Sequence, residues 1–352
     1  MGSDAEKLHI FFFPFMASGH MIPMIDIARL FAARGTKSTI ITTPLNALLI
    51  QESIDGDKKS GLDIGVQIIP FPSVEVGLPE GCENQNSVTS PEMVLNFFKH
   101  LQDAQDLACS SDATCYAAKK YGIPRLVFHG KCYFPLCVTE NIKRFAPHEK
   151  VESDSDIFVV PGLPHHIEMT KSQLPQRRET KNTMTDIQAK IQETEVTSYG
   201  VLVNSFYEME PAYAEYYKKD MRRRAWNIGP VSLYNRNSTA QRGHKATIDE
   251  NYCISWLNSK ERNSVLYVSF GSIYRIGTLQ MHEIAMGLEA SGIPFIWVVR
   301  TKNDSEHALP DGFEDRMQGK GLIIREWAPQ VRILDHPAVG GFMTHCGWEL
   351  NT

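Results

Sequence analysis

Uninterrupted runs of apolar residues mark most of the strands that this sequence predicts. One run covers residues 8–15, and residues 21–35 then repeat apolar positions at near-helical spacing. Residues 36–44, TKSTIITTP, are predicted as the next strand. Such runs are typical of parallel strands covered on both faces. Pro23 suits a first helical turn and Gly35 a helix end. The chain is therefore predicted to open with a right-handed strand–helix–strand unit.

The rest of the first half continues this alternation less clearly. Strands are expected at residues 62–71, 123–130 and 199–206, helices at 91–107 and 185–194, and a connector bounded by proline and glycine at 158–164. Residues 234–250 are polar and rich in Asn, Arg, Ser and Thr, which is the composition of a linker.

After this linker the alternation starts again. Strands are expected at 264–272, 294–300, 321–327 and 340–346, with helices at 278–292 and 328–338. We therefore predict an α/β protein of two Rossmann-like, doubly wound domains, residues 1–240 and 241–352, which face a cleft.

Composition and charge narrow the class of protein. The 352 residues are 42% hydrophobic and 22% charged, with a net charge of −5, as in soluble globular proteins. No basic stripe favours nucleic acid or an anionic membrane, and residues 8–15 are too few to span a bilayer. The acidic N-terminus is unlike a signal peptide, and the seven cysteines form no CxxC pair. We expect a cytoplasmic monomer with reduced thiols and no metal site.

His20 is the first candidate for chemistry. It follows the first predicted strand and precedes a helix, and open α/β sheets bind ligands at the carboxyl ends of their strands. An imidazole also has the pKa range of a general base. The plainer alternative is a histidine that caps or packs the helix start.

A second group of candidates follows the late strands. Trp327 could stack on a planar base, Gln330 is close behind it, and His345 and Gly347 could meet a phosphate. Each residue also has a structural explanation, as core packing or a strand-end hydrogen bond. Gly340 and Gly341 lie within a strand and form no G-x-G-x-x-G fingerprint, which disfavours a nicotinamide dehydrogenase.

A longer segment carries a resemblance to a known family. Residues 327–348, WAPQVRILDHPAVGGFMTHCGW, are similar to the opening half of the signature box of plant UDP-dependent glycosyltransferases, which have the GT-B fold. Residues 12–35, FFPFMASGHMIPMIDIARLFAARG, resemble the start of the subgroup of scopoletin and flavonoid glucosyltransferases. Similar segments, such as IPRLVFHG, VLVNSFYEMEP and SVLYVSFGS, extend the resemblance over nearly the whole chain.

The resemblance implies an inverting transfer of glucose from UDP-glucose to a hydroxyl of a small plant metabolite such as a flavonoid, coumarin or triterpenoid. His20 matches the family's catalytic base. The positions matching the donor site are Ser272, Trp327, Ala328, Gln330, His345, Gly347 and Trp348. The resemblance implies stacking of Trp327 on uracil, with the diphosphate held by Ser272 and His345. It implies no metal and no membrane span.

Three departures from the family pattern argue for impaired activity. Residues 349–352 replace the Asn-Ser pair and the glutamate that follow the last tryptophan in the family. The strand bearing the aspartate that orients the base has no counterpart before residue 117, since neither Asp106 nor Asp112 has the right spacing. Lys131 stands where the family has a small hydroxyl residue. The alternative hypothesis is therefore a truncated, catalytically impaired remnant that acts at most as a small-molecule binder.

Overall fold

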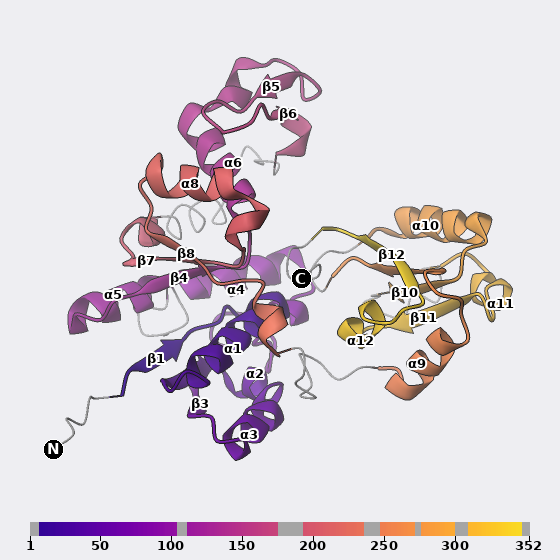
Figure 1. Ribbon diagram of the computed structural model, residues 1–352, viewed down its shortest axis with the longest axis horizontal. Coiled ribbons are helices and arrows are strands. Elements are labelled where there is room, and N and C mark those ends of the chain that lie inside the picture. Colours follow the sequence, from indigo (N-terminus) through magenta and orange to yellow (C-terminus); the bar gives the residue numbers. More distant parts are fainter. Residues whose placement is uncertain are drawn as a thin grey trace. The chain divides into compact units, whose positions relative to one another are not determined.

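The protein is represented by a computed structural model, which describes residues 7–103, 111–174, 193–235, 247–271, 276–299 and 309–346. Its chain divides into two compact units, residues 1–239 and 240–351 (Figure 1). Each unit is described by itself below.

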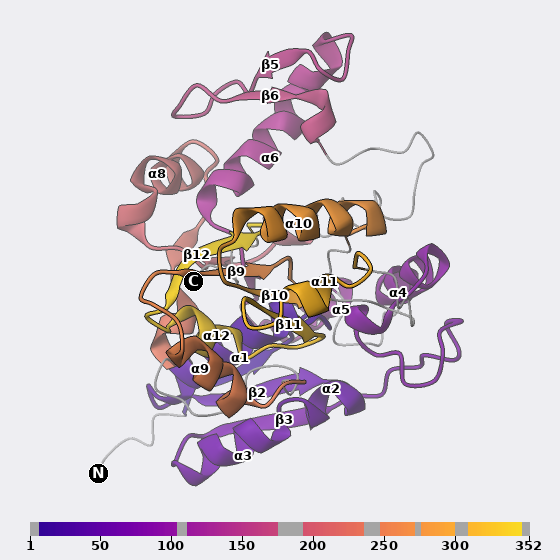
Figure 2. The ribbon, with the colours of Figure 1, turned by 90° about the vertical axis from the view of Figure 1, so that its right-hand side faces the viewer.

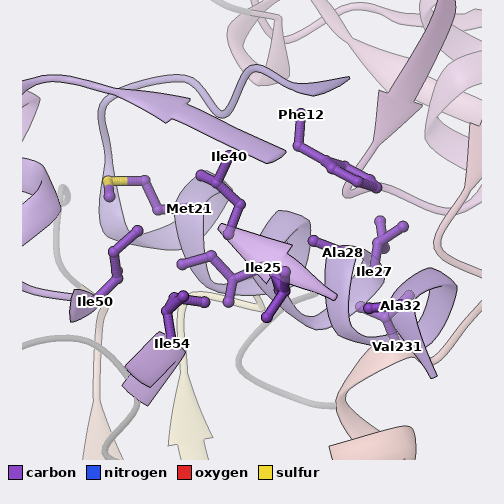
Figure 3. Packing of buried hydrophobic residues seen from close by; sticks show 11 residues of the cluster. Phe12, Met21, Ile25, Ile27, Ala28, Ala32, Ile40, Ile50, Ile54 and Val231 are labelled. Atoms are coloured by element: carbon purple, nitrogen blue, oxygen red, sulfur yellow. The ribbon is translucent and has the colours of Figure 1, made fainter. Parts of the chain in front are cut away.

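The first unit begins with a three-stranded parallel sheet. Its strands β1 (His9–Phe12), β2 (Lys37–Thr42) and β3 (Ile64–Ile68) lie in that order. Helix α1 (Ser18–Ala32) connects β1 to β2 and buries Ile25 and Ile27 against the sheet. Figure 3 shows this apolar cluster, to which α3 (Gln51–Lys59) adds Ile54. The predicted strand–helix–strand opening is confirmed.

A second parallel sheet follows in the same unit. It consists of β4 (Leu126–His129), β7 (Gly200–Val203) and β8 (Ala225–Asn227), with β7 in the middle. Helices α6 (Tyr133–Phe145) and α8 (Pro211–Lys219) pack on it through a cluster of buried residues. The members of this cluster include Tyr133, Cys137, Tyr213, Ala214 and Tyr217.

The two sheets are not hydrogen-bonded to each other in the described part of the chain. Strand β1 pairs there only with β2, and β4 pairs only with β7. The sheets still share apolar packing, because Phe128 of β4 contacts the cluster around α1 that contains Phe12 and Ile27. One edge of β1 and one edge of β4 therefore carry backbone groups without a strand partner among the described residues.

The remaining elements of the first unit are short or peripheral. They are α2 (Pro44–Leu48), α4 (Pro91–Asp103), α5 (Ser111–Tyr121), β5 (Ile157–Val159), β6 (Glu168–Thr170) and five short 3-10 helices, of which the last is Val231–Asn235. The connector predicted at 158–164 is partly wrong, because β5 pairs with β6 in an antiparallel ribbon. The end of the helix predicted at 91–107 and most of the helix predicted at 185–194 lie outside the described residues.

The second unit contains one parallel sheet covered on both faces. Its strands are β9 (Val265–Ser269), β10 (Phe295–Val299), β11 (Gly321–Arg325) and β12 (Val339–Thr344), in the order β11-β10-β9-β12. Helices α9 (Glu250–Asn258) and α12 (Gln330–Leu334) cover one face, and α10 (Thr278–Ser291) and α11 (Phe313–Arg316) pack with the cluster on the other. Figures 1 and 2 both show α10 opposite α9 and α12. The α/β prediction is confirmed.

Two further observations bear on the sequence expectations. The six cysteines in the described ranges all carry free thiols, while Cys109 falls outside those ranges. A helix long and apolar enough to cross a lipid bilayer is not found among the described residues.

Candidate functional site

His20 lies in the first turn of α1, just beyond the carboxyl end of β1. The helix begins at Ser18 after an extended Ala17 (φ −145°, ψ 142°), which is three residues before the helical pattern predicted from residue 21. The backbone N–H of His20 donates to the carbonyl of Ala17 at 2.9 Å. The helix therefore fixes the backbone of this residue and leaves its side chain exposed.

The surroundings of the His20 ring favour the neutral imidazole. Protein atoms around the ring, and secondarily the positive charge of Lys131, lower the pKa of His20 below its usual value. Phe15 packs edge-on against the ring at 5.3 Å between centroids. A neutral imidazole has a free nitrogen that can accept a proton, so His20 is in the form that a general base requires.

The aspartate partner that the family pattern leads one to expect is not seen here. Among the described residues no carboxylate forms a hydrogen bond with the His20 ring. Asp106 lies outside the described ranges. The charged group that acts on this imidazole in the described part is instead Lys131.

A polar network that the sequence analysis missed supports the start of α1. The side-chain amide of Asn86 donates to the Ser18 hydroxyl at 2.9 Å. Asn84 donates to the amide oxygen of Asn46 at 2.7 Å, and Asn46 donates to the Thr43 hydroxyl at 2.8 Å. Buried amides are expected to find such partners. The available signal was the clustering of Asn84 and Asn86 in a short segment between two predicted elements.

Lys131 follows β4 and immediately precedes a firmly anchored helix start. The carboxylate of Glu210 accepts hydrogen bonds from the backbone N–H groups of Tyr133 at 2.7 Å and Phe134 at 2.8 Å. Burial, with the charge of Glu210, raises the pKa of the Cys132 thiol to about 11, so this cysteine is not a reactive thiolate. The ammonium of Lys131 is exposed beside this anchored turn.

In the second unit, the candidate donor residues follow the carboxyl ends of parallel strands. Trp327 and Gln330 come after β11, and His345 comes after β12. All strands of this sheet are parallel, so these residues lie at the same edge of the sheet. That edge is where open α/β sheets bind ligands.

Neighbouring side chains hold these residues in different ways. The carbonyl of Trp327 accepts the N–H of Thr247 at 3.0 Å, and the amide oxygen of Gln330 accepts from the Tyr267 hydroxyl at 3.3 Å. Ala328 is buried in the core under the sheet. These contacts fix the turn between β11 and α12, while the indole of Trp327 is half-buried.

His345 is exposed at the end of β12, and burial of part of its ring lowers the pKa of the imidazole. The residue after it, Cys346, has a left-handed backbone (φ 57°). Ser272, Gly347 and Trp348 lie outside the described residues. The structure places Trp327, Ala328, Gln330 and His345 but tests the role of none of them, so all seven donor-site assignments stay predictions.

Comparison with known proteins gives consistent matches. A family model described as "UDP-glucoronosyl and UDP-glucosyl transferase" matches residues 233–350. Scopoletin glucosyltransferase of Nicotiana tabacum is 49% identical over 362 residues, which take in 97% of this chain and 76% of the relative. Anthocyanin 3'-O-beta-glucosyltransferase of Gentiana triflora is 48% identical, with 98% of this chain and 77% of the relative aligned. Both alignments are longer than this chain, so both relatives contain residues within the aligned region that have no counterpart here.

Solved structures agree with these matches. A crystal structure of a glycosyltransferase of Glycyrrhiza uralensis, complexed with glycyrrhetinic acid 3-O-monoglucuronide, is 40% identical with a TM-score of 0.87, over 97% of this chain and 74% of that one. A crystal structure of an Arabidopsis thaliana relative, complexed with UDP-L-rhamnose, is 28% identical with a TM-score of 0.70, over 98% and 76%. The extent of both matches, together with the identity to the curated relatives, shows that the chain belongs to the plant family 1 UDP-glycosyltransferases, which have the GT-B fold.

Proposed function

We propose that this chain transfers glucose from UDP-glucose to a hydroxyl group of a small plant metabolite, with inversion at the anomeric carbon. The acceptor's O–H proton goes to the imidazole of His20, and the acceptor oxygen forms a bond to the anomeric carbon. The bond from that carbon to the diphosphate breaks, and UDP leaves with the bonding electron pair. The similarity to glucosyltransferases of scopoletin and anthocyanin over nearly all of this chain carries the proposal.

The surroundings of His20 support its role as the base. The side chain is exposed at the carboxyl end of a parallel strand, and its lowered pKa keeps it neutral near pH 7. General-base assistance of this kind contributes roughly 10²–10⁴-fold to rate. The charge of Lys131 opposes formation of the imidazolium, so we expect the gain here at the lower end of that range.

The donor assignments rest on the edge of the second sheet. We propose that the indole of Trp327 stacks on the uracil ring, that Ala328 meets the edge of the base through its backbone, and that Gln330 lies near the ribose. His345 would donate a hydrogen bond to the diphosphate, together with Ser272 and the backbone of Gly347. Such donors stabilise the negative charge that develops on the leaving diphosphate. Trp348 is assigned to the sugar.

One observation favours a second candidate, an impaired remnant that binds small molecules without transfer. The His20 imidazole lacks a carboxylate hydrogen bond among the described residues, while Lys131 adds a positive charge nearby. An imidazolium formed in the transition state would then have no hydrogen-bonded carboxylate among the described residues to stabilise its positive charge. In this case, the chain would bind the acceptor, or UDP, without forming a glucoside.

The experiment compares the intact chain with a His20→Ala variant. Each is incubated with UDP-glucose and a panel of coumarins, flavonols and triterpenes, and glucosides are sought by mass spectrometry. The matched control is His336→Ala, because His336 lies outside the proposed site and bonds to Asn258. Melting temperatures with and without UDP-glucose report binding independently of turnover.

Glucoside formed by the intact chain and by His336→Ala, and lost in His20→Ala, supports the transferase. A melting temperature raised by UDP-glucose without any product supports the binding remnant instead. If no product forms and neither UDP-glucose nor any acceptor of the panel raises the melting temperature, both candidates are overturned.

A further inference from the structure

The first unit has a pocket that none of the proposed catalytic or donor-site residues line. It has a volume of about 440 Å³ and is lined by Tyr199, Lys218, Arg223, Arg224, Ala225 and Trp226. These residues come from the start of β7, the end of α8 and the start of β8. They therefore lie toward the amino-terminal ends of β7 and β8, whereas Lys131 follows the carboxyl end of β4 in the same parallel sheet.

The pocket concentrates positive charge. Five of the seven residues 218–224 are basic and one, Asp220, is acidic. In the described part of the chain, Lys218, Arg223 and Arg224 form no ion pair within 4.0 Å. Two carboxylates feel these charges. Arg223 helps to lower the pKa of Glu195, which accepts hydrogen bonds from His129 and Tyr217, and Lys218 helps to lower the pKa of Glu215, which pairs with Lys219. Three cationic groups thus line one pocket without direct neutralisation.

The aromatic side of the pocket is rigid. Tyr199 and Trp226 stack with 6.3 Å between centroids and 11° between planes, and the guanidinium of Arg224 lies 4.5 Å above the Tyr199 ring. A Cβ at Gly200 would come within 2.5 Å of the Trp226 ring, so the indole lies directly on the glycine backbone. The stack therefore holds the Arg224 guanidinium in place while its N–H groups stay available.

Preorganised guanidinium groups recognise oxyanions in a specific way. Arginine donates paired N–H groups that match phosphate oxygens, and such charge-assisted bonds are about twice as strong as neutral ones. A lysine ammonium adds a point charge, and Lys218 reaches only a weak contact of 3.4 Å to Asn227. Because three cations converge, a ligand with at least two negative charges fits better than a single carboxylate.

We propose that this pocket binds a phosphate-bearing ligand with at least two negative charges, held by Lys218, Arg223 and Arg224. This binding site is separate from the glucosyl-transfer site and does not depend on that function. The phosphate can come from a free metabolite or from a phosphorylated lipid headgroup, and the experiment separates these sources.

Isothermal titration calorimetry with inorganic pyrophosphate tests the proposal. Heat that Arg223→Gln and Arg224→Gln remove is assigned to this pocket, whereas heat that both variants retain is assigned to the proposed donor site. Arg223→Gln and Arg224→Gln are each expected to weaken pyrophosphate binding about tenfold or more, the loss of one charge-assisted contact. The matched control is Arg144→Gln, which removes one guanidinium from an isolated stack on Phe145 in the same unit. Melting temperatures confirm that each variant is folded.

If Arg144→Gln weakens pyrophosphate binding as much as Arg224→Gln does, the proposal is overturned, because the binding would then depend on the overall charge of the chain and not on this pocket. Citrate that binds as tightly as pyrophosphate would overturn the phosphate assignment. Flotation of the chain with phosphatidylcholine vesicles, with and without phosphatidylinositol 4-phosphate, identifies the source of the phosphate group. Arg224-dependent recruitment indicates a lipid headgroup, pyrophosphate binding without recruitment indicates a free metabolite, and absence of both refutes the site.

Discussion

Lys131 is the residue through which the electrostatics of His20 can be changed with little disturbance, because its side chain is exposed. Its positive charge is one of two causes that lower the pKa of His20, and the larger cause is the partial removal of water from the ring by surrounding protein atoms. In Lys131→Gln we expect the pKa of His20 to rise. The base is the neutral imidazole, so activity is lost as pH falls through this pKa, and the acidic limb of the kcat/KM profile should move to higher pH.

The same change can be followed without turnover by an NMR titration of the His20 ring. Lys150→Gln serves as the control, since it removes an equal charge from an exposed position elsewhere in the first unit. An equal shift in both variants, or none in Lys131→Gln, would show that Lys131 is not the local cause. The NMR titration therefore measures the effect of Lys131 on the pKa of His20 whether or not the chain is catalytically active.

At the scale of elements, the start of α6 depends on one buried carboxylate. Glu210 accepts from the N–H groups of Tyr133 and Phe134 and from the Ser205 hydroxyl. Glu210→Ala leaves these donors without that acceptor, and we expect a loss of about 1–3 kcal/mol in the free energy of unfolding. Urea titration measures it. Glu208→Ala, whose side chain is exposed in the preceding 3-10 helix, should cost little.

Strand β12 contains a second element-level constraint. Gly340 is the extra residue where the pairing of β12 with β9 shifts register between Val339 and Gly341. A Cβ at Gly340 would come within 2.3 Å of the carbonyl oxygen of Asn263, which is backbone and cannot move aside easily. We expect Gly340→Ala to destabilise the second unit by about 1–3 kcal/mol, measured by thermal denaturation.

The adjacent glycine provides the control for this prediction. A Cβ at Gly341 would meet only the end of the Leu266 side chain, at 3.1 Å, which can rotate away. Gly341→Ala should therefore cost much less. Equal losses in the two variants would contradict the role of the bulge and point to a general intolerance of side chains in this strand.

The elements that the sequence predicted best are those with strong local signals. Strands such as β10 are uninterrupted apolar runs, and all five of its residues are buried. Helix α3 went unpredicted because its sequence QESIDGDKK offers one buried residue, Ile54. The ribbon of β5 and β6 was missed because each strand has three residues, and pairing between distant short segments leaves no local periodicity.

The candidate site shows the same difference between residues with a local sequence signal and contacts between distant segments. His20 was found because its strand and helix are locally encoded, and Trp327 and His345 because each follows a buried strand. The network of Asn84 and Asn86 was missed because it brings together side chains more than thirty residues apart from the groups they contact. The effect of Lys131 on His20 was missed because it depends on the contact between two separate sheets rather than on spacing along the chain.

At the scale of the whole molecule, one edge of β1 matters most, because it has no strand partner among the described residues. Strand edges without a partner are templates for pairing with another chain. Phe11 lies on β1 with 47% of its surface exposed, which adds apolar area to that edge. We predict concentration-dependent self-association, and we expect Phe11→Lys to reduce it, because a lysine on an edge strand opposes pairing.

Sedimentation velocity over a range of concentrations measures this association. Leu279→Lys is the control, because Leu279 is 84% exposed on α10, away from any strand edge. The chain has a net charge of −5 and a pI of about 6.2, so repulsion between copies is weakest near that pH and association should be stronger there than at pH 8. If Leu279→Lys reduces association as much as Phe11→Lys does, the loss of an exposed apolar side chain rather than the edge of β1 governs it.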